Sequence, residues 1–337
     1  MSAAETTTAK VPPTRPSPSP RNGAGLPGGS TGTGKTVRKR TAGSAAVPWA
    51  LLAPCLLIIL LVMGYPLVRL VTLSFQSFGK SELWGFKDAE WVGFKNFSAI
   101  LGDGEFWAVV VRTVVFTAGA VVLTMVLGML IALLMQRVSG WVKALISIAL
   151  VASWGMPIIV ATAIFKWIFD TDYGVLNWLL SKLPGVEMAG HNWFASGTQG
   201  LAVITLLVVW GAVPFVVITL SAGLTQVPKE MEEAARLDGA GAWGVFRWVT
   251  LPILKPIIVM LTTLSVIWDM GVFPQVFVMR GGNPEAEFQL LTTYSYQKAF
   301  VVNDYSGGSA IALVTVLLLL GVVAVYMRQM LKIGEVE

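Results

Sequence analysis

The chain has 337 residues, of which 55% are hydrophobic and 13% are charged. The charged share is about half of that in an ordinary soluble protein, which excludes a soluble enzyme, a disulfide-rich secreted domain and a disordered chain. Residues 1–40 hold seven Lys/Arg and one acidic residue, whereas the remaining 17 basic and 18 acidic residues nearly cancel. The composition therefore predicts a membrane protein with a basic N-terminal arm.

The scarcity of cysteine and histidine restricts the chemistry that this chain can perform. Cys55 is its only cysteine and His191 its only histidine. An intramolecular disulfide and a two-cysteine metal site are therefore excluded, and no second ligand lies near the histidine. We therefore expect no metal site in this chain.

The arm contains one pattern that resembles a nucleotide site. Residues 1–36 are rich in Pro, Gly, Ser and Thr, and we expect a disordered basic cytoplasmic arm over residues 1–46. Gly29–Thr36 fits the phosphate-loop pattern G-x-x-x-x-G-K-[ST]. That loop works only between a buried strand and a helix, but here a Pro-rich stretch precedes it and a run of basic residues follows. We interpret the match as a chance one.

Six apolar runs are long enough to cross about 30 Å of hydrocarbon, which takes roughly 20 helical residues. They predict an all-α polytopic membrane protein with six transmembrane helices. The expected spans are about 48–74, 107–135, 142–168, 200–223, 253–279 and 308–330.

Basic residues predict the orientation of these spans. The connections on the side of the N-terminus hold twelve basic residues, and the opposite loops hold six. Cytoplasmic loops carry the excess of Lys and Arg, so we expect both termini in the cytoplasm and the protein in the cell membrane. The twelve are Lys35, Arg38, Lys39, Arg40, Arg137, Lys143, Lys229, Arg236, Arg247, Lys255, Arg328 and Lys332.

The connection at 224–252, between the fourth and fifth spans, is neither apolar enough to cross nor disordered in composition. Pro228 is placed to begin a helix, and Gly239 is placed to end it in the left-handed conformation. A second short helix over about 241–249 would present an apolar side made of Trp243, Phe246 and Val249. We expect a cytoplasmic helix-turn-helix with a face for a partner protein.

This connection resembles the signature of the membrane permease subunits of binding-protein-dependent ABC importers. The signature is E-A-A, three residues, G, nine residues, then I-x-L-P. The chain has Glu233-Ala234-Ala235, then Gly239, then Val249-Thr250-Leu251-Pro252 at the same spacings. Val249 in place of Ile is the only departure.

Other stretches resemble the carbohydrate branch of that family, the maltose and glycerol-phosphate type permeases. The resemblance departs late in the fifth span, at Phe273-Pro274, and after it, at Arg280–Pro284, which puts the identity of the sugar in doubt. The stretches that carry it are Asp238–Ala240, Leu251–Pro256, Tyr65–Leu67 with Ser74-Phe75, Val92–Phe97 and Tyr294–Phe300.

The resemblance implies a six-helix permease domain over 47–332, followed by a cytoplasmic tail at 333–337. It also implies a second permease subunit, an extracellular solute-binding protein, a carbohydrate substrate and two cytoplasmic ATPase subunits that bind ATP and Mg. This chain would then not be an enzyme and would have no catalytic residue and no cofactor of its own. The partners also include membrane lipid but no nucleic acid. The segment that couples to the ATPase would contain Glu233, Ala234, Ala235, Asp238, Gly239, Phe246, Leu251 and Pro252.

Asp269 is the clearest ionisable residue at membrane depth, about 17 residues beyond Pro252. A carboxylate there costs roughly 3 kcal/mol and marks a path, an ion pair or a subunit contact. Trp268 and Gln275 flank it, and an indole and an amide suit sugar rings and hydroxyls. These three residues form the expected substrate path. The equal alternative is that Asp269 faces a partner subunit or a buried cation.

Three other functions compete with a sugar permease. An ABC permease for another small polar solute, such as a glycerol phosphodiester or a polyamine, is the nearest one. A secondary transporter would show inverted repeats or several intramembrane charges. A membrane enzyme would need clustered His, Asp or Glu at one membrane face. We also expect Trp154 and Trp210 to be lipid-facing or packing residues.

Overall fold

The computed structural model describes residues 43–334, with side chains from Trp49 to Met330. The Gly29–Thr36 pattern, nearly all of the expected arm and residues 335–337 lie outside the described residues. The chain divides into two compact units, residues 1–57 and 58–337. Of the first unit, the structure describes the beginning of helix α1 (Gly43–Ile59), whose side chains from Trp49 to Leu57 are apolar and exposed.

Five stretches of continuous helix in the described chain are long and apolar enough to span a membrane. Three of them confirm expected spans within a few residues: α5 (Gly104–Met135), α9 (Gly197–Leu224) and α15 (Tyr305–Gly334). The first span combines α1 with a π-helical turn at Leu60–Gly64 and α2 (Tyr65–Ser74). The fifth contains α12 (Leu251–Met270).

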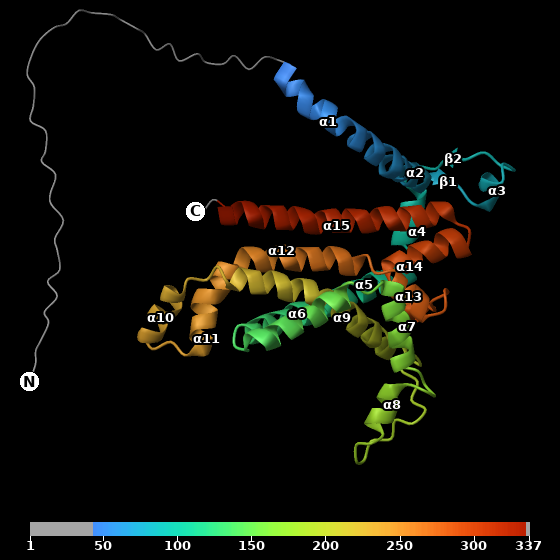
Figure 1. Ribbon diagram of the computed structural model, residues 1–337. Coiled ribbons are helices and arrows are strands. Elements are labelled where there is room, and N and C mark those ends of the chain that lie inside the picture. Colours follow the sequence, from blue (N-terminus) through green and yellow to red (C-terminus); the bar gives the residue numbers. More distant parts are fainter. Residues whose placement is uncertain (1–42, 335–337) are drawn as a thin grey trace, which may run out of the picture. The chain divides into compact units, whose positions relative to one another are not determined.

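Helices α5, α9 and α12 pack on one another and form the centre of the second unit (Figure 1). Small residues allow the backbones of these helices to approach closely, as is usual between membrane helices. Ala120 and Ala132 of α5 are fully buried, and a Cβ on Gly128 would lie 2.5 Å from Cγ1 of Val216 on α9. Helix α6 (Gly140–Trp154) packs on α9 as well.

A second core cluster joins α5 to the helices around α15. Helix α15 packs on α2, α4 (Lys95–Leu101), α12 and α14 (Leu291–Tyr296). The buried side chains of Phe106 on α5, Tyr294 on α14 and Ile311 on α15 belong to this cluster. Burial and the nearby Asp103 carboxylate raise the pKa of the Tyr294 phenol, which donates a 3.2 Å hydrogen bond to that carboxylate and stays protonated. The network ties the segment before α15 to the start of α5.

The remaining elements are short. Strands β1 (Gln76–Ser77) and β2 (Glu90–Trp91) pair antiparallel, with Gln76 opposite Trp91. Helix α3 (Lys80–Leu83) lies between them in the chain, and α8 (Val175–Leu180) lies in the connection before α9. Two further turns are a 3-10 helix at Ala286–Phe288 and a π-helical turn at Gln297–Val301.

The expected third span is wrong as a single helix over 142–168. Helix α6 ends at Trp154, and α7 (Ile158–Ile168) leaves at an angle of 101°. The bend lies at Gly155-Met156-Pro157, where Pro157 lacks an N–H and caps the second helix in an extended conformation. The span is therefore a broken one, and the described chain has up to six spans only if this bent pair is counted.

The expected fifth span, 253–279, is wrong at its far end for a similar reason. Helix α12 stops at Met270, and α13 (Pro274–Met279) starts after three non-helical residues. Pro274 occupies the first helical position of α13, where its missing N–H costs nothing. The short α13 packs against α7, so the helix breaks that precede α7 and α13 lie close to each other.

The close contact of α5 and α9 can be tested at Gly128. We expect Gly128→Val to lower the midpoint of thermal unfolding in detergent by several degrees, because the added side chain must displace Val216. Gly321→Val is the control, since a Cβ at Gly321 meets no atom within 4 Å. Equal midpoints for the two variants would contradict this packing.

Candidate functional site

The two helix breaks border one cavity of about 250 Å³. The α6–α7 break lines it from one side and the α12–α13 break from another, and α9 completes the wall. A broken helix within a membrane is tolerated where it lines a cavity or is buried in protein. The lining residues are Ser153, Trp154, Met156, Ile158, Ala161, Val208, Trp210, Gly211, Ala212, Trp268, Asp269, Val272 and Gln275.

Polar atoms without partners gather at this cavity. Asp269 is buried, with 3% of its surface exposed, and its Oδ2 has no hydrogen-bond partner among the described residues. The same holds for Oε1 of Gln275 and Oγ of Ser153. Buried polar atoms are nearly always satisfied, so three such atoms at one cavity indicate a place for a polar ligand or water. Trp268, Asp269 and Gln275, the three residues of the expected substrate path, all line this cavity.

Three indoles complete the lining, from Trp154, Trp210 and Trp268. The ring of Phe215 lies between two of them, 6.1 Å from that of Trp154 and 5.4 Å from that of Trp268. Trp154 is 56% exposed and Trp268 is 49% exposed, so both offer open ring surface. Trp154 and Trp210 are thus lining residues as well as packing residues, which the sequence did not indicate.

Asp269 has no cation beside it within the cavity, because the described lining contains no Lys, Arg or His. The alternative of a cation buried next to Asp269 therefore has no support in the described chain. A contact of Asp269 with a partner subunit stays a prediction. What the cavity offers chemically is one carboxyl group, one amide and one hydroxyl between aromatic rings.

The helix-turn-helix is the second region of interest. Helix α10 (Lys229–Leu237) ends in the motif that the sequence predicted: Gly239 has φ +89°, its N–H donates to Arg236 O, and Ala240 N–H donates to Ala235 O. Pro228 is the N-cap of α10 and not its first helical residue, a small correction. Positive φ at this position requires glycine sterically.

The second helix of this pair continues directly into the fifth span. Helix α11 (Ala242–Val245) passes through a π-helical turn at Phe246–Thr250 into α12. Apolar side chains stay exposed here, with Leu237 at 90%, Trp243 at 73% and Trp248 at 74%. Of the residues expected to couple to an ATPase, those exposed are Glu233, Ala234, Asp238, Gly239 and Pro252, and those half-buried are Ala235, Phe246 and Leu251.

The connection around α8 forms a small ordered structure of its own. The Asn177 amide donates to Asp170 O, Thr171 O and His191 O, and its carbonyl accepts from Trp193 Nε1 at 2.7 Å. Backbone N–H groups of Tyr173 and Asp172 lower the pKa of the Asp170 carboxyl. The result is a folded projection and not a loose loop.

Comparison with known proteins gives the family. Residues 124–332 match the family described as the inner membrane component of binding-protein-dependent transport systems. The chain belongs to this family. It is 41% identical to the diacetylchitobiose uptake system permease protein of Streptomyces coelicolor, over 96% of this chain and 98% of that protein. It is 35% identical to the sulfoquinovosyl glycerol transport system permease protein of Agrobacterium fabrum, over 82% of this chain and 88% of the relative.

A solved structure has the same fold as this permease. It is a bacterial alginate ABC transporter in complex with an alginate pentasaccharide-bound periplasmic protein. The match has a TM-score of 0.72 and covers 86% of this chain and 96% of that chain, at 16% sequence identity. At that identity the likeness shows the permease fold alone.

Sequence reasoning missed the contribution of the third span to the cavity. Ser153, Met156 and Ile158 enter the lining because the chain breaks between them. The signal was Gly155-Met156-Pro157 in the middle of an apolar run. Proline is common in membrane helices, so this signal by itself does not distinguish a kink from a 101° bend.

The left-handed turn gives a direct test of the local structure. We expect Gly239→Val to cost about 1–2 kcal/mol at the end of α10, because a side chain is strained at positive φ. Hydrogen exchange of the Ala240 amide, which donates to Ala235 O at 2.9 Å, should become faster. Gly241→Val is the matched control in the same turn, since Gly241 has φ −69°. Equal exchange in both variants would contradict the turn.

Proposed function

We propose that this permease forms half of the translocation pathway of an ATP-driven importer for a neutral mono- or oligosaccharide. The observation that carries the proposal is the cavity at the two helix breaks, where Ser153, Asp269 and Gln275 offer unpartnered polar atoms between indole rings. Sugars present hydroxyls at their edges and C–H groups on their faces, so they suit both kinds of surface. The names of the two relatives above support a sugar compound as the solute, and that of the diacetylchitobiose permease supports a neutral one.

The remaining parts of the importer are proposed from the resemblance and the exposed surfaces. A second permease subunit would complete the pathway, and two cytoplasmic ATPase subunits would bind ATP and Mg. The exposed Leu237, Trp243 and Trp248 of the helix-turn-helix would seat against an ATPase subunit. An extracellular binding protein would deliver the sugar. Both termini would then be cytoplasmic, with the α8 projection on the outer side.

A small polyamine is the one alternative solute that a specific observation favours. Asp269 is buried and has no cation in the cavity lining, and three indoles could hold an ammonium group through cation–π contacts. A sugar accounts better for the unpartnered Gln275 and Ser153, because hydroxyls both donate and accept. The two solutes are compared in the experiment below.

Uptake into proteoliposomes that contain the assembled importer tests the proposal. We expect Trp268→Ala and Asp269→Asn each to reduce uptake of a labelled neutral disaccharide by roughly ten- to hundredfold, since each lost contact is worth about 1–3 kcal/mol in a buried site. Trp141→Ala is the control, because Trp141 is 72% exposed at the start of α6 and outside the cavity. Uptake of a labelled polyamine instead of any sugar would establish the alternative solute.

Two outcomes would contradict the proposal. Sugar uptake equal to the unmodified importer in both cavity variants would remove the cavity from the pathway. Uptake that persists without ATP would exclude the ATP-driven mechanism. Binding-protein-stimulated ATP hydrolysis, measured on the same vesicles, identifies variants that failed to assemble.

A further inference from the structure

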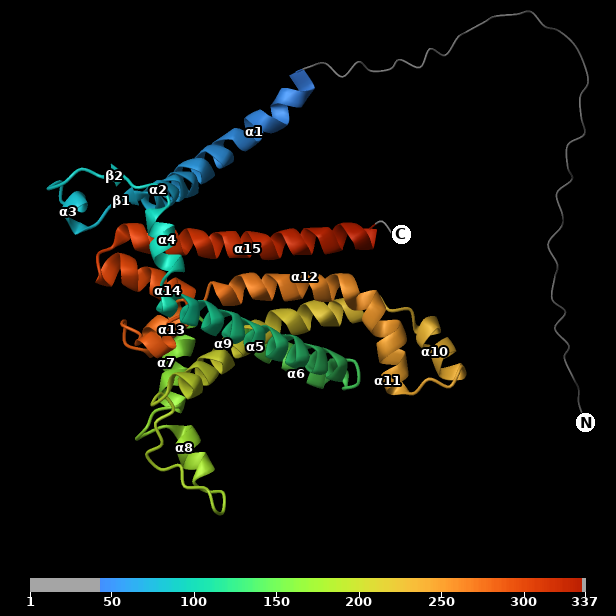
Figure 2. The same ribbon diagram turned by 180° about the vertical axis from the view of Figure 1, so that it is seen from behind.

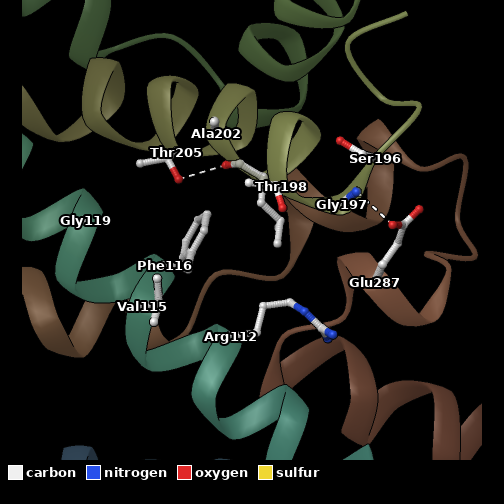
Figure 3. A pocket seen from close by; sticks show the side chains of 11 residues that line it. Arg112, Val115, Phe116, Gly119, Ser196, Gly197, Thr198, Ala202, Thr205 and Glu287 are labelled. Atoms are coloured by element: carbon white, nitrogen blue, oxygen red, sulfur yellow. Dashed lines mark hydrogen bonds between the residues drawn. The ribbon is translucent and has the colours of Figure 1, made fainter.

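A second hollow, a groove of about 460 Å³, lies between α5 and α9 and shares no lining residue with the cavity described above. Figure 3 shows Arg112 and Glu287 at one end of it and Phe116 and Gly119 toward the other. Its wall is polar at the first end and apolar at the second. The polar end is lined by Arg112, Ser196, Thr198 and Glu287, and the other end by Val115, Phe116, Gly119, Leu201, Ala202 and Thr205, whose hydroxyl donates to Leu201 O.

The change from polar to apolar runs along the helices. Helix α5 has 32 residues, which at 1.5 Å per residue is about 48 Å against about 30 Å of hydrocarbon. Arg112 is the ninth residue of α5, about 12 Å from its start, and therefore lies near the boundary between headgroups and hydrocarbon. Gly119 lies two turns deeper. The groove thus has its charged end where lipid headgroups lie and its apolar end where acyl chains lie.

The charged end of the groove is held in place by hydrogen bonds, and it still has N–H donors and a carboxylate oxygen without partners. Nη1 of Arg112 donates to Ala286 O and Gln289 O, both at 2.9 Å, which holds the guanidinium still. Its Nε and Nη2 have no partner among the described residues. Glu287 accepts from Gly197 N–H through Oε2 at 2.8 Å, and its other oxygen is free within the described chain.

The charges at this end are of both signs. Arg112 is the cation of the groove lining, and Glu287 is its carboxylate. A cation and a carboxylate together do not make a site for a phosphate alone, because the carboxylate repels it. A headgroup that carries a phosphate and a primary ammonium together complements both signs.

We propose that this groove binds a zwitterionic aminophospholipid, with its phosphate on Arg112, its ammonium on Glu287, and one acyl chain along Phe116, Gly119 and Leu201. Space for the chain is present at Gly119, where a Cβ would meet no atom within 4 Å. The lipid would hold the starts of α5 and α9 and the 286–289 segment together, since all three contribute to the charged end. This site is independent of the identity of the transported solute.

Retention of lipid by the assembled importer tests the site. The complex is equilibrated with an equimolar mixture of phosphatidylethanolamine, phosphatidylcholine and phosphatidylglycerol of the same chains, and bound lipid is counted by native mass spectrometry. We expect at least fivefold more phosphatidylethanolamine than phosphatidylcholine, whose methylated ammonium has no N–H to donate. Glu287→Gln should bring that ratio close to one, while its amide oxygen can still accept from Gly197 N–H.

Two further variants distinguish binding of the lipid headgroup from binding of the acyl chain. Arg112→Gln should weaken retention of all three lipids at this site, because each carries the phosphate. Gly119→Leu should do the same by filling the apolar end, and Gly321→Leu is its control on another span, also with open space at Cβ.

Three results would overturn the proposal. The first is an equal count of the three lipids in the unmodified complex, and the second is a preference for phosphatidylglycerol. The third is efficient crosslinking of a Val115→Cys variant to the partner permease, which would make the groove a subunit contact. Because Glu287→Gln retains the hydrogen-bond acceptor for Gly197, the test stands even if Arg112→Gln fails to assemble.

Discussion

The requirement that backbone N–H and C=O groups be satisfied inside hydrocarbon governs this structure. Continuous helices meet it by themselves, which is why α5, α9 and α15 run unbroken. The helices are interrupted at Gly155–Pro157 and at Gly271–Phe273, and both interruptions border the same cavity. Breaks of this kind are tolerated where they line a cavity or are buried in protein. The cavity and the broken helices therefore belong to one arrangement, and the unpartnered atoms of Asp269, Gln275 and Ser153 lie within it.

The same helix carries both regions to which we assign function. From Ala242 to Met270 the chain is helical throughout, with 29 residues and a length of about 43 Å. Exposed Trp243 lies near one end and Asp269 near the other. A rigid element can transmit a displacement over that distance, so movement of the helix-turn-helix by an ATPase would reach the cavity wall. Figure 2 shows α10 and α11 at the opposite end of α12 from α13.

Much of the fold and part of the candidate site could be predicted from the sequence, because they depend on local sequence patterns. The lengths of the apolar runs predicted four of the six spans as continuous helices. Gly239 at its position in the E-A-A signature predicts a left-handed helix end, which the structure has. Asp269 could be singled out from the sequence as the clearest ionisable residue at membrane depth, and in the structure it lines the cavity. The 101° bend and the meeting of Ser153 and Trp154 with Asp269 could not be predicted, since they result from the packing of α7 on α13. A proline in an apolar run is compatible with a straight, a kinked and a broken helix.

Protection of the cavity by sugar is the most direct test of the central claim. A Ser153→Cys variant is made in a Cys55→Ser background, which removes the chain's only native cysteine, and a Ser147→Cys variant serves as the control outside the cavity lining. Each is labelled with a small maleimide in the assembled importer, with and without sugar-loaded binding protein under turnover. The account predicts that sugar slows labelling at position 153 at least fivefold and leaves position 147 unchanged. Equal labelling at position 153 in an importer that still moves sugar would contradict it.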